Sequence, residues 1–174
     1  VFTAMRDELQ MLAKPDTATP DMAVSIASES PSTQASATKT ASSIASNIAV
    51  PISPGELIAK ITICQIKTER MTDPAKLRNV NHELSLLLAS LEESVPASPE
   101  LSELTAKLKE INEKLWVIED DIRDCERHKD FSSRFIELAR AVYFSNDVRA
   151  TIKRQINDLL NSPLVEEKSY AKYD

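Results

Sequence analysis

Two stretches decide the fold of this chain: Leu115-Trp-Val-Ile-Glu-Asp-Asp-Ile-Arg123 and Phe135-Ile-Glu-Leu-Ala-Arg-Ala-Val-Tyr-Phe-Ser-Asn-Asp-Val-Arg149. In both, apolar residues recur three and four positions apart, which is the period of an amphipathic α-helix. Charged residues of both signs stand between those apolar positions. The sequence therefore predicts helices here, with polar side chains running beside the apolar face.

The composition is that of an all-α protein. The 174-residue chain contains one Gly and nine Pro. This composition indicates few tight turns and several long elements that end at prolines. Hydrophobic residues make up 42% of the chain but aromatic residues only 5%, so Leu, Ile, Val and Ala must build the core. We predict an all-α fold, an antiparallel bundle of four to five helices.

Charge and cysteine content restrict the partners and the compartment. A formal net charge of -6 disfavours nucleic acid, whose binding depends on Lys and Arg that displace counterions. No membrane partner is predicted, because no apolar run approaches the ~18 residues of a membrane span. Cys64 and Cys125 each fall on an apolar stripe, where a thiol behaves as a small hydrophobe. Two unpaired thiols suit a reducing compartment, so we predict a cytoplasmic location.

The chain divides into three parts by composition. Residues 1–13 carry apolar side chains at helical spacing, and we expect a short amphipathic helix that ends an upstream domain. Residues 14–47 are rich in Ser, Thr, Ala and Pro and cannot bury enough surface to offset their ordering entropy, so a disordered linker is predicted. Residues 48–174 are predicted to form the helical bundle domain.

Capping residues and prolines mark where the helices of the bundle begin. Ser53-Pro-Gly-Glu56 combines an N-cap Ser, Pro at the first helical position and a Glu that closes a capping box. Asp73-Pro74 and Ser98-Pro99 repeat the cap and the proline. The apolar residues after Ser98 keep a near-heptad spacing, typical of a helix that pairs along its whole length, as in a coiled coil. These signals predict helices at residues 54–71, 74–93 and 99–125, the first two forming a hairpin.

The last third of the chain leaves one alternative open. Helical spacing runs over residues 131–144 and again over 148–160, with Ser145-Asn-Asp147 between them. That tripeptide is either a break with a fresh cap or part of one bent helix. The tail from Asn161 begins with a turn, and its two tyrosines are in position to fold back on the bundle.

Several short sequence motifs occur along the chain in a specific order. They are Ser53-Pro-Gly-Glu-Leu-Ile-Ala-Lys-Ile-Thr-Ile63, Asp73-Pro-Ala-Lys-Leu77, Phe135-Ile-Glu-Leu-Ala-Arg140 and Glu166-Glu-Lys-Ser-Tyr170. By these motifs, residues 51–173 resemble an uncharacterised bacterial helical family, the domain-of-unknown-function family 6165. The resemblance implies a helical fold and a link with glycan or glycosyltransferase systems, and it implies no particular reaction.

Polar residues of the segment 137–149 follow one another at spacings of three, so a continuous helix is expected to line them up as one ridge. Glu119 and Arg123 on an antiparallel helix would face that ridge. Two interpretations stay open: an Arg–carboxylate network that fixes the packing register, or a pocket in which Arg forks bind an anionic or sugar ligand. The candidate ligand-binding residues are Arg123, Glu137, Arg140, Tyr143, Asn146 and Arg149.

Other chemistry-bearing residues have simpler explanations. Asp124 and His128 stand four positions apart in an acidic segment, but ion pairs with neighbouring Arg and Lys explain that segment, and no metal or cofactor is predicted. His82 is assigned to the surface and Trp116 to the core. Neither histidine has a visible partner for acid–base work, so no catalytic residue is predicted.

The function expected from these patterns is that of a non-enzymatic helical interaction or scaffolding module. Its partner would be another protein or a second copy of the chain, because the apolar stripes of the hairpin can exceed what one helix covers. The alternative is a small-ligand or metal-binding enzyme whose site uses the ridge from Glu119 to Arg149. An anionic ligand or a nucleotide sugar would suit that alternative.

Overall fold

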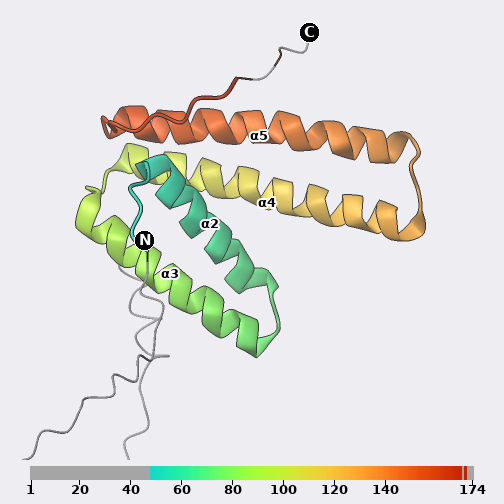
Figure 1. Ribbon diagram of the computed structural model, residues 1–174, viewed down its shortest axis with the longest axis horizontal. Helices are drawn as coiled ribbons and strands as arrows, with labels where there is room; N and C mark the ends of the chain where they lie inside the picture. The colour runs from blue at the N-terminus through green and yellow to red at the C-terminus, as the bar shows by residue number, and fades with distance from the viewer. Residues whose placement is uncertain (1–47, 170, 172–174) are drawn as a thin grey trace, which may run out of the picture. The chain divides into compact units, whose positions relative to one another are not determined.

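The computed structural model describes residues 48–169 and residue 171. These residues contain four helices and no strand, which confirms the all-α class (Figure 1). The helices belong to one compact unit, Val50–Asp174. The helix expected at residues 1–13 and the linker expected at 14–47 lie outside the described residues, as do the tyrosines of the tail. The helices are α2 (Pro54–Arg70), α3 (Pro74–Ser94), α4 (Pro99–His128) and α5 (Ser133–Leu159).

The predicted caps start the first three helices. The Ser53 hydroxyl oxygen accepts a hydrogen bond from the Glu56 backbone N–H at 3.3 Å, and Ser98 accepts one from the Leu101 N–H at 3.1 Å. The Asp73 carboxylate accepts from the N–H groups of the first turn of α3. Each of these caps satisfies a donor that has no partner inside its own helix.

The region around Ser145 is one continuous helix, which resolves the alternative of a break. Ser145 is buried at 2% exposure, within the face of α5 that packs on the bundle. The Asn146 side-chain amide donates to the Val142 carbonyl at 3.0 Å, one turn earlier. Polar residues that suggested a cap therefore bond inside the helix or are buried by its neighbours.

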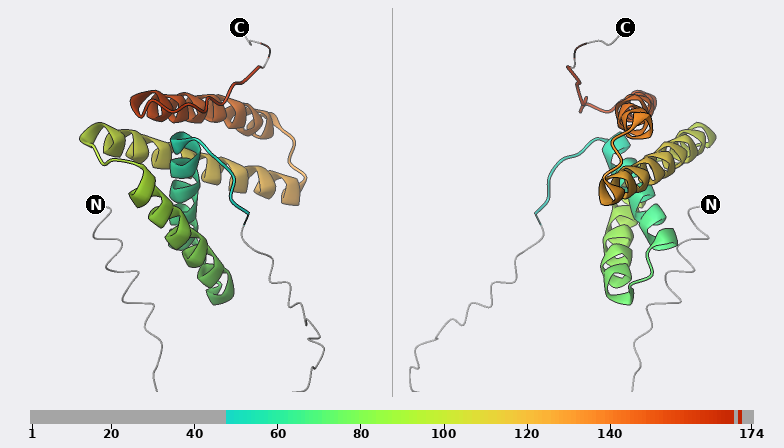
Figure 2. Two further views of the ribbon diagram at one scale, coloured as in Figure 1. Left: turned by 60° about the vertical axis from the view of Figure 1, so that its left-hand side comes forward. Right: turned by 90° about the vertical axis from the view of Figure 1, so that its right-hand side faces the viewer.

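α2 packs closely against each of the other three helices, whereas the sequence pattern indicated residues 99–125 as the helix that pairs along its whole length. Helices α4 and α5 run antiparallel beside each other (Figure 1), and α2 packs on both of them and on α3 (Figure 2). Ile58, Ile61 and Ile66 of α2 are each 1% exposed. Burying one such side chain contributes about 1.5–3 kcal/mol, so α2 anchors the core.

The chain's one glycine stands where α2 meets α5. Gly55 donates its backbone N–H to the Asn157 side-chain oxygen at 2.8 Å. A Cβ at this position would lie 2.5 Å from the Lys153 carbonyl oxygen and 2.9 Å from the Asn157 Oδ1. Only a residue without a side chain permits this approach, so the glycine of the Ser53-Pro-Gly-Glu56 motif serves helix packing.

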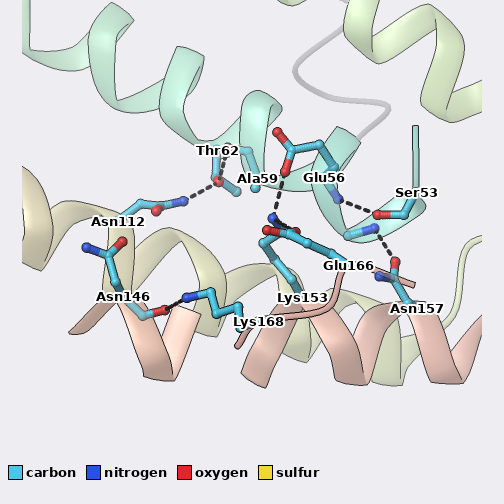
Figure 3. Close-up of polar contacts among 11 residues, drawn as sticks. Ser53, Glu56, Ala59, Thr62, Asn112, Asn146, Lys153, Asn157, Glu166 and Lys168 are labelled. Atoms are coloured by element: carbon cyan, nitrogen blue, oxygen red, sulfur yellow. Dashed lines mark hydrogen bonds and ion pairs between the residues drawn. The ribbon is translucent and has the colours of Figure 1, made fainter. Parts of the chain in front are cut away.

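Lys153 ties three segments together beside that glycine (Figure 3). Its ammonium group pairs with the Glu56 carboxylate of α2 at 2.7 Å and with Glu166 of the C-terminal segment. Burial lowers the pKa of Lys153, but the hydrogen bonds to Glu166 and Glu56 outweigh burial and hold that pKa above its ordinary value. The same contact with Lys153 lowers the pKa of Glu166.

The segment after α5 folds back along that helix. Ser162 donates its backbone N–H to the Asn157 carbonyl at 2.9 Å, which turns the chain. Glu167 then pairs with Arg154 at 3.3 Å, and the Lys168 ammonium group donates to the Asn146 carbonyl at 3.3 Å. The described part of the tail is thus fixed to α5 by a series of polar contacts.

Cys64 and Cys125 are both buried and form no disulfide, as the sequence predicted. Burial, with the nearby Glu83 carboxylate, raises the pKa of the Cys64 thiol. Within residues 48–169, none of the helices combines the length and the apolar character needed to cross a bilayer.

Candidate functional site

An open cavity of about 470 Å³ lies where α2, α4 and α5 meet. Ile63 and Ile66 of α2 and Leu115 of α4 form its apolar lining. The polar lining comes from α4 and α5, with Trp116 beside it. A volume of this size suits a small organic ligand, since such sites measure about 300–1,000 Å³. The polar residues are Asn112, Glu119, Asp120, Arg123, Asn146 and Arg149.

Three of the six predicted ligand residues line this cavity: Arg123, Asn146 and Arg149. Arg123 donates to the Glu119 carboxylate and to the Glu119 carbonyl, both at 2.7 Å, so its charge is already matched. Arg149 differs, because none of the carboxylates in the described part of the chain lies within 4.0 Å of its guanidinium group. The cavity therefore contains one arginine matched by a close ion pair and one, Arg149, unmatched at contact distance, whose charge acts at longer range to help lower the pKa of Glu166.

The other three predicted residues, Glu137, Arg140 and Tyr143, are exposed and do not line the cavity. The Arg140 guanidinium carbon lies 6.0 Å from the centre of the Phe144 ring. A helix turns about 100° per residue, so each step of three residues falls about 60° short of a full turn. Residues spaced only by three therefore drift around the helix, and the expected single ridge does not form.

Sequence reasoning missed three cavity residues that stand four positions apart on α4: Asn112, Trp116 and Asp120. Trp116 is half-buried and faces the cavity, so its assignment to the core was wrong. The Asp120 carboxylate is exposed and forms no ion pair with any residue that the structure describes. A search for polar and aromatic residues at spacings of four would have found this row, since such residues share a helix face.

Asn112 is held by a buried hydrogen-bond chain between α4 and α2 (Figure 3). Its side-chain N–H donates to the Thr62 hydroxyl oxygen at 2.9 Å, and that hydroxyl donates to the Ala59 carbonyl at 2.9 Å. The hydroxyl has a single hydrogen, so it can only accept from Asn112. The amide must therefore turn its nitrogen toward Thr62 and its oxygen away.

The Asn112 side-chain oxygen has no hydrogen-bond partner in the described structure, although the residue is only 4% exposed. Leaving a buried acceptor unsatisfied costs about 1–3 kcal/mol. Asn112 is thus a cavity-lining residue whose side-chain oxygen is buried without a hydrogen-bond partner among the described residues.

The acidic end of α4 does not form a metal site of the usual kind. Asp124 accepts a hydrogen bond from Arg127 at 2.9 Å, and the His128 ring nitrogen contacts the Asp124 carbonyl oxygen at 2.9 Å. Within the described ranges, no three His, Cys, Asp or Glu side chains stand together as metal ligands. His82 is exposed, as predicted.

These features define a small all-α domain with a polar, ligand-sized cavity between three helices. The chain belongs to the family of unknown function DUF6165, which matches residues 48–173. This match confirms the family resemblance that the sequence motifs indicated. Comparison with curated proteins and with solved structures finds no match.

Proposed function

We propose that this domain binds a small anionic ligand in the cavity between α2, α4 and α5. The observation that carries the proposal is Arg149, an arginine on the cavity wall with no carboxylate within 4.0 Å among the described residues. A guanidinium group offers a planar fork of donors that fits phosphate and carboxylate. Trp116, which lines the same cavity, offers a flat apolar surface for the rest of the ligand.

The two candidate arginines on the cavity wall differ in their partners. Arg123 is paired with Glu119 within α4 and needs no ligand. Arg149 lines the same cavity from another helix, α5, and its charge has no carboxylate within contact distance among the described residues. A half-buried arginine on the wall of an open cavity can bind an anion that enters from solvent. The proposal therefore rests on Arg149 rather than on the whole predicted ridge.

A thermal melt of the whole chain tests the proposal, since a ligand that binds only the folded state raises its melting temperature. The probes are inorganic phosphate, a nucleoside monophosphate and a sugar phosphate, each titrated into the millimolar range. We expect a rise for the wild type that is lost in Arg149→Ala. The matched control is Arg140→Ala, an exposed arginine of the same helix outside the cavity, which should respond as the wild type does.

Two results would contradict the proposal. One is the absence of any rise with all three probes. The other is an equal rise in the wild type and in Arg149→Ala, because the anion would then bind elsewhere. A cytoplasmic location fits the two unpaired buried thiols and remains a prediction, as does a link with glycan or glycosyltransferase systems.

The second candidate function is the non-enzymatic interaction or scaffolding module, acting through a second copy of this chain. The observation that favours it is the turn between α4 and α5 together with the first turn of α5, where Phe131 is 54% exposed and Ile136 is 57% exposed. Because a two-fold dimer needs only one self-complementary patch, this apolar turn can meet its own copy. Light scattering over a range of concentrations tests this candidate, which fails if Phe131→Ser leaves an observed dimer unchanged.

A further inference from the structure

We infer that the ligand of this cavity carries an N–H or O–H donor at the end away from its anionic group, and that the Asn112 side-chain oxygen accepts from that donor. The inference rests on the proposed function, because Arg149 is taken as the anion-binding residue. Its own evidence is separate: the hydrogen-bond chain from Asn112 through Thr62 to Ala59 and the unmatched oxygen that this chain leaves.

The orientation of the Asn112 amide follows from its hydrogen bond with Thr62. Turning the amide over would place its oxygen against the Thr62 hydroxyl oxygen, whose hydrogen is already donated to Ala59. Two acceptors would then face each other, and the amide hydrogens would point away unused. With the amide nitrogen bonded to Thr62 and the Thr62 hydroxyl bonded to Ala59, the side chain presents its oxygen, an acceptor, at its free edge. A ligand group that donates there gains the hydrogen bond that the protein does not supply.

The rest of the lining fixes the shape of the ligand. Asn112 and Asp120 are two turns apart on α4, a rise of about 12 Å, and Trp116 stands midway between them. The Asp120 carboxylate also accepts donors and repels an anion, so the anionic group belongs on the α5 side, at Arg149. The ligand thus has a ring that can lie on Trp116, donors directed toward α4 and one negative group directed toward α5.

Two kinds of small molecule share this chemistry. A nucleotide has a base with an amino group and a phosphate, and a sugar phosphate has hydroxyl groups and a phosphate. Both have a ring with a face that stacks on an indole. Because Trp116 is the chain's one tryptophan, its fluorescence reports directly on occupation of this cavity.

The test is a fluorescence titration of the whole chain with four probes. Adenosine monophosphate is compared with purine riboside monophosphate, which has the same ring and phosphate but lacks the amino group. Glucose 6-phosphate tests the hydroxyl donors, and inorganic phosphate reports the anion site alone. A site with a buried acceptor rejects ligands that leave it unpaired, so we expect the donor-bearing ligand to bind at least about tenfold more tightly than its matched analogue.

Substitutions of Asn112 and of its hydrogen-bond partner Thr62 test whether the preference for donor-bearing ligands depends on the Asn112 oxygen. In Asn112→Ala the preference for the donor-bearing ligand should disappear, while Arg149→Ala should weaken all four probes alike. Thr62→Val keeps the side-chain shape but removes the hydroxyl that the amide nitrogen bonds to, so the amide can turn over and the preference should also fall. The melting temperature of each variant will show whether it folds. If Asn112→Ala does not fold, Thr62→Val still tests the inference.

The outcomes separate this inference from the proposed function. A preference for adenosine monophosphate that depends on Asn112 supports a base with an amino group, and a preference for glucose 6-phosphate supports a hydroxylated ring. Equal binding of all four probes, dependent on Arg149 and unchanged by Asn112→Ala, overturns the inference and leaves the proposed anion site standing. Failure of every probe to bind overturns the anion site and the inference with it.

Discussion

Two buried polar clusters of this domain differ in one respect. Around Gly55, the Asn157 oxygen accepts a backbone N–H and the Lys153 ammonium group meets two carboxylates, so the polar groups are matched within the protein. Around Asn112, the amide nitrogen is matched and the oxygen is not. The two asparagines are equally buried, at 5% and 4% exposure.

The difference teaches how to separate packing from function among buried polar residues. A matched group at a helix crossing fixes the register of the helices and needs nothing further. A buried polar group without a hydrogen-bond partner destabilises the folded state, because it has lost its bonds to water. A ligand that bonds to this group can remove the penalty. The first cluster is therefore read as structural and the second as a site.

The largest expected effect comes from Gly55→Ala. Alanine normally stabilises a helix relative to glycine by about 0.5–1 kcal/mol. Here its Cβ would lie 2.5 Å from the Lys153 carbonyl oxygen, so α2 must move away from α5. We expect a loss of up to about 3 kcal/mol in the free energy of unfolding, measured by urea denaturation. The exposed Lys60→Ala on the same helix is the control, and a gain in stability for Gly55→Ala would disprove the close approach.

The second prediction compares the two asparagines directly. Asn157→Leu leaves the Gly55 N–H, which has no partner within its own helix, without an acceptor, and should cost about 1–3 kcal/mol. Asn112→Leu also removes a hydrogen bond but eliminates the unmatched oxygen, so its cost should be smaller, about 1 kcal/mol or less. Equal losses in the same denaturation assay would show that both clusters are structural.

The sequence predicted the helices better than their arrangement. Ser53, Asp73 and Ser98 marked three starts correctly, because capping is a local interaction that short motifs specify. The central place of α2 was not predicted, since it depends on how Gly55 and Asn157 meet across 102 positions of sequence. The continuity of α5 through Ser145 was left open for the same reason, because burial by other helices decides it.

The candidate site was predicted only in part. Arg123, Asn146 and Arg149 reach the cavity, and Glu137 and its two neighbours in the predicted set do not, because steps of three residues drift around the helix. Asn112 escaped notice since a polar residue within an apolar stripe carries no sign of whether its hydrogen bonds are complete. That property is visible only once Thr62 of α2 is placed beside it.

A smaller effect is expected from the matched cluster at low pH. The pKa of Glu166 lies below its ordinary value of 4.5 because Lys153 donates a hydrogen bond to it. A group whose pKa is lower in the folded state stabilises the fold above its unfolded pKa, and this contribution is lost as the pH falls through the folded pKa. The stability difference between the wild type and Glu166→Gln should therefore be constant near neutral pH and shrink below pH 4.5.

Urea denaturation at a series of pH values measures this difference. Glu167→Gln is the control, because the Glu167 side chain is 73% exposed and its contact with Arg154 lies on the surface. A difference between the wild type and Glu166→Gln that persists unchanged to the lowest pH would show that the Lys153 contact does not depend on the charge of Glu166.

The smallest expected effect is that of Arg123→Ala, which lines the cavity but belongs to a matched pair. Its side chain is 65% exposed, and a pair of this kind four residues apart on a helix contributes about 0.3–0.5 kcal/mol. The free energy of unfolding should therefore change very little. Anion binding should weaken slightly, because the released Glu119 carboxylate repels the ligand, and added salt should reduce this loss. If Arg123→Ala instead abolishes binding as Arg149→Ala is expected to, the ligand displaces Glu119, and the division into matched and unmatched arginines fails.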